Sequence, residues 1–441
     1  MAAPGKSRPT TIQTSKTRRH RRPRQARHPD ARPYAFYCRY WVCSRDGGVV
    51  SISLSVVRVA IVGGGIGGMA AAVALWRQGI EAHVYEQAPR LKEVGAGVAL
   101  HPNGVRMLRR LGLGEDVVRF GARWVDPQFR RFDGTLIAPW WSPGEGASIE
   151  IYGMHRADLL QMLLDRVPTA AIHPGSRCIA FSQDSKAASL EFENGSRITA
   201  DVVVGADGIH STLQRYVTRP SQPIPSGSVA YRGLIGAASV RWPAGQMRNF
   251  LGPGKHFLVF PVRSNTLLNY VGFVASGELT RESWSAPGDP DALRREFAGW
   301  DPTVQAILDE VQDCFWWGLY DREPLARWTT GRLTLLGDAA HPMLPHVGQG
   351  ANQAIEDAVA LATVLARADA ASAPAALRAY EQVRRPHAAR VQASSRANGA
   401  RYDFARRNAT VRDRELSSQA RDRAWMWDFD AEAEARAALT R

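Results

Sequence analysis

The chain has 441 residues, of which 45% are hydrophobic, so it is long enough to form two domains with well-filled cores. A formal net charge of +14 would suggest nucleic-acid binding, but most of the excess positive charge lies in one N-terminal segment. Residues 1–57, here called the leader, hold 12 Lys and Arg against 2 Asp and Glu, so the rest of the chain carries only about +4. We therefore expect no nucleic-acid partner for the folded part.

The leader is rich in proline and arginine and shows no helical periodicity, so it buries too little apolar surface to fold alone. Three interpretations stay open. The leader is an upstream stretch translated from a misassigned start near residues 49–57, an Arg-rich and acid-poor transit sequence, or a basic arm for nucleic acid or anionic membrane. No apolar signal-peptide core precedes a small-residue cleavage site.

The first chemical motif follows the leader directly. An apolar strand at 59–62 runs into Gly63, Gly65 and Gly68, and a helical stretch follows. Glu86 closes the next strand about 20 residues beyond the first glycine, where a carboxylate accepts a hydrogen bond from a ribose hydroxyl. The glycines let the backbone approach a diphosphate, and the helix N-terminus supplies N–H donors. The motif therefore predicts a dinucleotide site.

A membrane span is the alternative for the same segment, because residues 59–76 contain no charged side chain. Five glycines in six positions make a poor helix, however, and no second apolar span follows. We therefore prefer a turn followed by a helix, and expect no membrane partner.

The cysteines point to a reducing compartment. Cys38 and Cys43 lie in the leader, while Cys178 and Cys314 are far apart, and no C-x-x-C pair occurs. This usage argues against structural disulfides and against a metal site, so we expect a cytoplasmic protein.

Beyond the first motif, α/β and β-rich stretches alternate. Short strands with turn signals follow residue 129 and are interrupted by one helix at 155–165. Residues 225–320 are again rich in strand signals, with a hairpin of apolar strands over 257–273. The charged tail from residue 396 is expected to be helical, with an aromatic anchor at 425–430.

A second strand-loop-helix unit stands some 270 residues after the first. The apolar strand 333–336 leads to Asp338, a Pro/Gly loop covers 342–350, and an amphipathic helix follows. A third α/β fragment ends at Asp207. Two ligand loops so far apart in one chain imply a single large cofactor held between them.

With these motifs placed, the chain resembles the single-component FAD-dependent aromatic hydroxylases of the p-hydroxybenzoate hydroxylase fold group. It is most similar to their salicylate hydroxylase and 6-hydroxynicotinate 3-monooxygenase-like members. The resemblance covers about residues 58–435 and rests on the first glycine motif, the Asp207 segment and the Asp338 unit. It implies an α/β fold with a discontinuous, Rossmann-type FAD-binding domain, an inserted β-rich substrate domain and C-terminal helices.

The resemblance also implies domain boundaries. The FAD-binding domain would comprise 58–128, 150–225 and 325–395, the substrate domain 129–149 and 226–324, and the helical tail 396–441.

It further assigns cofactor contacts residue by residue. The AMP half of FAD would lie against Gly63, Gly65, Ile66, Gly68, Glu86 and Gln87. The flavin half would lie against Val98, Arg106, Arg156, Asp207, Asp338, Gly348, Gly350 and Asn352. Each assignment has an alternative: Asp338 only caps the N-terminus of a helix, Asp207 is a turn residue, and Arg156 is a surface helix residue.

The implied reaction is reduction of FAD by NADH or NADPH, capture of O2 as a flavin C4a-hydroperoxide, and hydroxylation of a small aromatic substrate. The flavin carries the chemistry, so the protein needs a polar group that orients and helps to ionise the substrate. The candidates are His346, Tyr231, Arg232 and His256. Ser228 stands where several relatives carry a histidine, which leaves the substrate open.

Two alternatives remain. The same fold acts on a bulkier apolar substrate, as an epoxidase, a quinone-pathway hydroxylase or an antibiotic-modifying oxygenase. In the other, the chain is a flavin-bearing regulatory protein whose leader binds nucleic acid. A monomer and a homodimer are equally compatible with the sequence.

Overall fold

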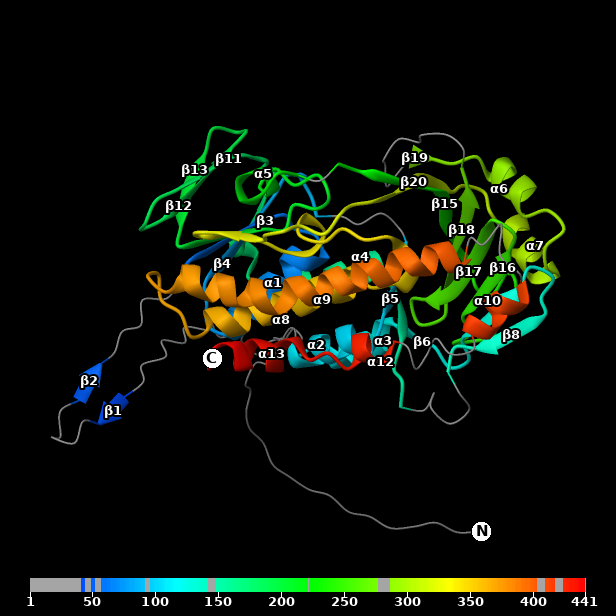
Figure 1. Cartoon of the computed structure of the whole chain (residues 1–441), viewed down its shortest axis with the longest axis horizontal. Coiled ribbons are helices and arrows are strands. Elements are labelled where there is room, and N and C mark those ends of the chain that lie inside the picture. The colour runs from blue at the N-terminus through cyan, green and yellow to red at the C-terminus, as the bar shows by residue number, and fades with distance from the viewer. Residues whose placement is uncertain are drawn as a thin grey trace, which may run out of the picture.

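The structure, a computed structural model, describes residues 41–43, 49–51, 57–91, 96–141, 148–220, 222–276, 286–402, 409–416 and 423–440. In the leader it describes only the short antiparallel pair β1 (Trp41–Cys43) and β2 (Val49–Ser51) besides Val57, so the origin and role of the leader lie outside the described residues. Figure 1 shows two β-rich bodies side by side, with long helices packed along the first.

The first body is built on a six-stranded sheet assembled from distant parts of the chain. Its strand order is β10 (Ile172–Pro174), β4 (Ala82–Glu86), β3 (Val59–Val62), β14 (Val202–Gly205), β22 (Leu333–Leu335) and β21 (Thr329–Thr330). All neighbours are parallel except β21 and β22. Both faces are covered, so β3 and β14 are buried throughout and read as continuous apolar runs. The three expected α/β fragments therefore form one discontinuous sheet.

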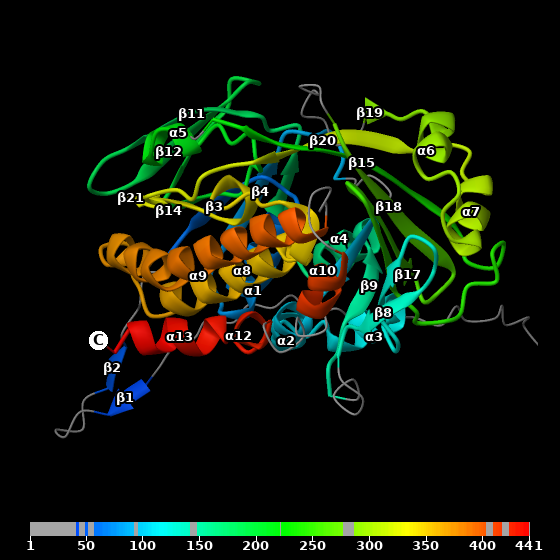
Figure 2. The same cartoon turned by 45° about the vertical axis from the view of Figure 1, so that its right-hand side comes forward.

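Helices cover one face of this sheet. Figures 1 and 2 show α1 (Ile66–Arg77), α8 (Gly350–Leu365) and α9 (Ala373–Tyr402) stacked beside one another, with α13 (Ala431–Ala438) along α8. The small sheet β11 (Cys178–Gln183), β12 (Ala188–Phe192) and β13 (Arg197–Ala200) and helix α5 (Gln214–Val217) lie near the other face. Residues 59–76 form a strand, a turn and a twelve-residue helix. Among the described residues no helix is long and apolar enough to cross a membrane.

The second body is an eight-stranded sheet. Its order is β19 (Ala286–Pro287), β20 (Phe315–Asp321), β15 (Ile224–Gly236), β18 (Leu267–Ala275), β17 (Lys255–Val262), β16 (Arg248–Gly252), β7 (Gln128–Arg131) and β8 (Leu136–Pro139). The expected apolar hairpin is confirmed as β17 and β18. Helices α6 (Pro290–Glu296) and α7 (Pro302–Asp309) cover one face, where Phe257, Tyr270 and Phe297 form a core. The opposite face of this sheet lines the cavity described below.

Short elements join the two bodies. One of them is a three-stranded sheet in the order β5 (Gly97–Leu100), β9 (Tyr152–His155) and β6 (Ala122–Arg123). Three helices contact this sheet: α2 (Pro102–Arg110), α3 (Gly114–Phe120) and α4 (Arg156–Leu164). The tail contributes α10 (Ala409–Leu416) and α12 (Ala424–Trp427). Helix α9 runs without a break through residue 396, where the tail was expected to begin, so that boundary coincides with no element boundary.

Candidate functional site

The first glycine loop is shaped by close backbone contacts. Gly63 has a φ of +107°, and a Cβ there would lie 2.2 Å from the Ala206 carbonyl oxygen. A Cβ on Gly68 would lie 2.0 Å from the Gly63 oxygen. Nothing lies within 4 Å of a Cβ on Gly65, which faces the cavity described below. Two of the three glycines are therefore required by packing, and the third keeps open the space in front of α1.

The N-terminus of α1 is suited to an anion. No side chain caps it, so the N–H groups of its first turn remain available to a ligand. Glu86 accepts hydrogen bonds from the backbone N–H groups of Gly64 (2.7 Å) and Ala88 (2.8 Å), which fixes the end of β4 against the loop. Gln87 is exposed beside it. These features fit the diphosphate and ribose of a dinucleotide.

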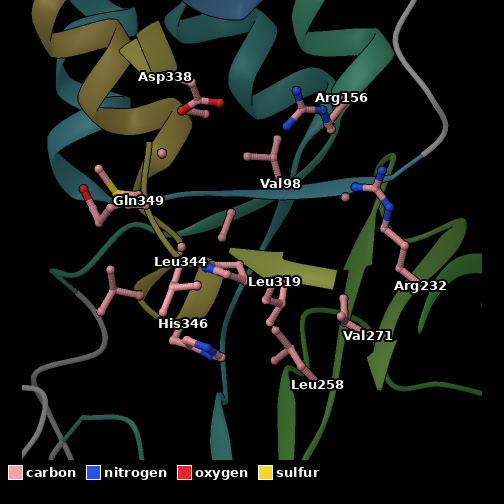
Figure 3. A pocket seen from close by; sticks show the side chains of 18 of the residues that line it. Val98, Arg156, Arg232, Leu258, Val271, Leu319, Asp338, Leu344, His346 and Gln349 are labelled. Carbon is pink, nitrogen blue, oxygen red and sulfur yellow. The ribbon is translucent and has the colours of Figure 1, made fainter. Parts of the chain in front are cut away.

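A cavity of about 340 Å³ extends from this loop to the free face of the eight-stranded sheet. Figure 3 shows Asp338, Val98 and Arg156 on one side of it and Leu258, Val271, Leu319 and His346 on another. It is lined by both bodies, and the ligand loops, far apart in sequence, meet here.

The second ligand loop connects β22 to α8 through the short turns η3 (Gly337–Ala339) and η4 (Pro345–Val347). Asp338 is exposed and lines the cavity; Leu336, not Asp338, occupies the N-cap position of its turn, so the N-cap alternative is wrong. Gly348 has a φ of +65°, and Gly350 opens α8, whose N-terminus also has no side-chain cap. Both glycines line the cavity.

Asn352 acts from behind this loop. It is fully buried; its Oδ1 accepts from the His101 N–H (2.9 Å), and its Nδ2 donates to the carbonyl oxygens of Ala99 and Gly348, both at 2.9 Å. The side chain thus fastens the loop to β5 and does not line the cavity.

A buried ionic network lies under the same loop. Arg384 of α9 contacts Glu356 (2.8 Å) and Asp357 (2.7 Å) of α8, and all three side chains are fully buried. Asp357 also contacts His341 at 2.5 Å, and Glu356 accepts from Asn103 at 2.8 Å. Burial raises the pKa of Glu356 to about 7. This network holds the Asp338 loop against α8, and sequence reasoning missed it.

The remaining cofactor candidates divide into two groups. Ile66, Val98 and Arg156 line the cavity. Arg106 instead donates to the backbone oxygens of Trp427 and Phe429 and fastens the C-terminal segment.

Asp207 accepts from the N–H groups of Thr212 (2.7 Å) and Leu213 (3.3 Å), while its neighbours Ala206 and Gly208 line the cavity. Burial raises the pKa of Asp207. Arg106 and Asp207 therefore hold neighbouring segments in place behind the cavity and do not themselves line it.

Strand alternation sorts the candidate catalytic residues. Arg232 pairs with Val271, and both line the cavity. Tyr231 points to the opposite face, where it packs against the core beneath α6 and α7. The structure therefore does not bring Tyr231 to the cavity. Ser228, further along β15, is buried and lies outside the lining.

The two histidines come together. His256 stacks on Phe273 with ring centroids 4.1 Å apart, and its ring lies 5.7 Å from that of His346. Tyr402, at the end of α9, lies 5.3 Å from His256 and 6.4 Å from His346. All of them line the cavity. Sequence reasoning missed Tyr402, because nothing in a charged helical tail shows that it reaches the site.

Arg232 occupies a different part of the cavity. Its guanidinium lies 4.5 Å from the centroid of the Trp317 ring. Figure 3 shows Arg232 on the opposite side of the cavity from His346. Arg232 and the histidine pair therefore cannot be treated as one cluster.

The comparisons with known proteins agree with this site. A family described as FAD binding domain matches residues 56–395. A 3-amino-4-hydroxybenzoate 2-monooxygenase from Streptomyces platensis is 39% identical over 390 residues, covering 85% of this chain and 97% of its own. A salicylate hydroxylase from Pseudomonas putida is 35% identical, covering 84% and 92%.

Solved structures show the same fold. A salicylate hydroxylase substrate complex is 30% identical, with a TM-score of 0.77 over 88% of this chain and 98% of that one. HpxO from Klebsiella pneumoniae, complexed with FAD and uric acid, is 27% identical with a TM-score of 0.73, covering 87% and 97%. The resemblance inferred from the motifs is confirmed, and the chain belongs to the family of FAD-binding monooxygenases.

Proposed function

We propose that the chain, with FAD bound, hydroxylates a small aromatic ring that carries a hydroxyl group and a carboxylate. One observation carries the proposal: a single cavity joins two glycine loops suited to a dinucleotide to an apolar wall with a histidine pair. The substrate class is supported by two similar proteins, a 3-amino-4-hydroxybenzoate 2-monooxygenase and a salicylate hydroxylase, because both are named for such aromatic acids.

The residues of the chain fit FAD. The diphosphate would lie at Gly65 and the first turn of α1, and a ribityl hydroxyl would donate to Asp338. The N-terminus of α8 would stabilise negative charge on the flavin ring system. When bound, FAD supplies the redox chemistry that lets NADH or NADPH and O2 hydroxylate the ring.

The apolar wall orients the substrate and keeps water out. Leu258, Val271 and Leu319 form this wall opposite the Asp338 loop (Figure 3). His346 would accept the proton of the substrate hydroxyl, since imidazole exchanges protons near neutral pH. His256 and Phe273 pack against His346 and hold its ring in place.

The test is NADH and NADPH oxidation by the FAD-loaded protein across a panel of hydroxylated aromatic acids, with hydrogen peroxide measured in parallel. One acid should accelerate oxidation with little peroxide. His346→Ala should abolish product formation while FAD stays bound, and Tyr231→Phe, on the other face of β15, should match the unaltered protein. A slow, uniform rate across the panel would reject this substrate class.

Other properties stay predictions. Cys178 and Cys314 are free and buried, which supports a reducing, cytoplasmic location. A chain lacking residues 1–56 should keep its turnover and solubility if the leader has no regulatory role; lost turnover would support the regulatory alternative.

A further inference from the structure

One end of the cavity is an aromatic box that we call the indole lobe, formed by Trp124, Trp140, His101, Met247 and Asn249. The Trp124 and Trp140 rings meet edge to face at 5.7 Å, and His101 lies 6.3 and 6.4 Å from them. Asn249 lies on β16, and the other four residues flank β16, β6, β8 and α2, so the lobe lies beyond β17 on the side away from Arg232.

The lobe contains polar atoms that are buried without a partner among the described residues. They are the indole Nε1 atoms of Trp124 and Trp140, the Nδ1 atom of His101 and the Oδ1 atom of Asn249. Trp124 is 2% exposed and Asn249 is 3% exposed. Two other indoles of the described residues are paired: Trp76 donates to the Ala82 oxygen at 3.0 Å, and Trp242 to the Gln246 oxygen at 2.9 Å. The Trp427 Nε1 is also buried without a partner, but Trp427 does not line the cavity.

An unpaired buried donor costs free energy, so unpaired donors on side chains that line a cavity indicate a ligand that accepts from them when it binds. Two N–H groups on one small lobe suit an acceptor with two oxygens. The Asn249 amide, whose oxygen and nitrogen are exchanged by a half-turn, can present either to the same ligand.

The lobe is also electropositive. Arg423 is buried, its guanidinium lies 4.6 Å from the Trp140 ring centroid, and it donates to the Tyr402 hydroxyl at 3.0 Å. Burial first, and the Arg423 charge second, hold the pKa of His101 at about 3, so His101 is neutral near pH 7. Among the described residues that line the cavity, the sole carboxylate is Asp338, on the cofactor side.

Arg232 is too far away to share this ligand. Arg232, Val271, Leu258 and Asn249 stand in one row across four neighbouring strands. Three strand spacings separate Arg232 from Asn249, or about 14 Å. The Arg232 side chain leans further away, over Trp317 of β20.

We infer that the indole lobe binds the carboxylate of the aromatic substrate, with Trp124 and Trp140 as its hydrogen-bond donors and Arg423 supplying positive charge behind them. The inference rests on the proposed function and deepens it. Tyr402 connects the lobe to the histidine pair, so a substrate held by its carboxylate would direct its hydroxyl toward His346.

The test compares each acid with its analogue that lacks the carboxylate, using the FAD-loaded protein and the visible flavin spectrum to obtain Kd. The pairs are 3-amino-4-hydroxybenzoate with 2-aminophenol and salicylate with phenol. Trp124→Phe and Trp140→Phe should each weaken acid binding by about 10- to 150-fold, the loss expected for one hydrogen bond to a charged group, with unchanged binding of the neutral analogue. The inference is overturned if acid and neutral analogue lose affinity equally or neither does.

Trp427→Phe is the matched control, because the Trp427 Nε1 is also buried without a partner but does not line the cavity. It should change neither Kd. Retained flavin absorbance and an unchanged thermal melt establish folding of each variant.

Asn249→Asp is an independent test, because a second carboxylate on this wall should repel the acid and spare the neutral analogue. Unaltered protein that binds and hydroxylates neutral phenols as well as acids would overturn the inference and leave aromatic hydroxylation standing. Failure of every aromatic compound to stimulate NADH or NADPH oxidation would reject both.

Discussion

Replacing Gly65 by alanine adds one methyl group at a place where nothing lies within 4 Å. The backbone there has φ −71° and ψ −176°, which alanine adopts freely, so the apoprotein should change in stability by no more than about 1 kcal/mol. The methyl group would occupy the space expected for the FAD diphosphate. Overpacking costs about 1–3 kcal/mol, which corresponds to a Kd for FAD about 5- to 150-fold weaker.

Gly68→Ala should act on the fold itself. Its added Cβ would lie 2.0 Å from the Gly63 backbone oxygen, and the Gly63 site is itself held against Ala206. A backbone obstacle cannot rotate away, so we expect the apoprotein to lose about 3 kcal/mol, the upper end of ordinary overpacking.

Urea unfolding of both apoproteins and flavin fluorescence titration with FAD measure the two effects separately. A Gly65→Ala protein that binds FAD as tightly as the unaltered chain would refute the placement of the diphosphate. A Gly68→Ala apoprotein of undiminished stability would refute the close-packing argument.

Three further predictions concern buried charge, pH and the second loop. Arg384→Met leaves the buried carboxylates of α8 without their cation and should lower the free energy of unfolding by about 3–5 kcal/mol in urea; a loss below about 1 kcal/mol would contradict this. His101, whose pKa falls from 6.5 to about 3, stays unprotonated in the folded protein where the unfolded chain takes up a proton, so it makes apoprotein stability fall by about 1.4 kcal/mol per pH unit as pH drops from 6.5 toward 3. His101→Gln should lessen the slope by that amount and leave the contribution of His387, whose pKa also falls to about 3; an unchanged slope in urea titrations at pH 6 and 5 would disprove it. Asp338→Ala should weaken FAD binding about tenfold or more without destabilising the apoprotein, because its side chain is exposed; unchanged fluorescence titrations would rule out its contact with FAD.

The sequence was sufficient for the cofactor domain because its signals are local. Gly63, Gly65 and Gly68 stand between a buried strand and a helix, and Asp338 follows another buried strand, so both loops were predictable without knowing how they meet. Periodicity also predicted the β17–β18 hairpin.

The substrate wall was less predictable, because its composition depends on which face of a sheet is covered. Tyr231 and Arg232 are neighbours on one strand, and only the packing of α6 and α7 turns the first away from the cavity. Arg106 contacts residues more than 300 positions later in the chain, and Tyr402 and Arg423 reach the site from the tail. No local pattern encodes such contacts.

The most direct test of the central claim is to supply ¹⁸O₂ to the FAD-loaded protein with NADH or NADPH and the best aromatic acid of the panel, and to measure the mass of the product by mass spectrometry. The account predicts a hydroxylated product that carries one ¹⁸O atom from O₂ and none from labelled water. NADH or NADPH consumption that yields only hydrogen peroxide with every acid, or label that enters from water, would contradict it.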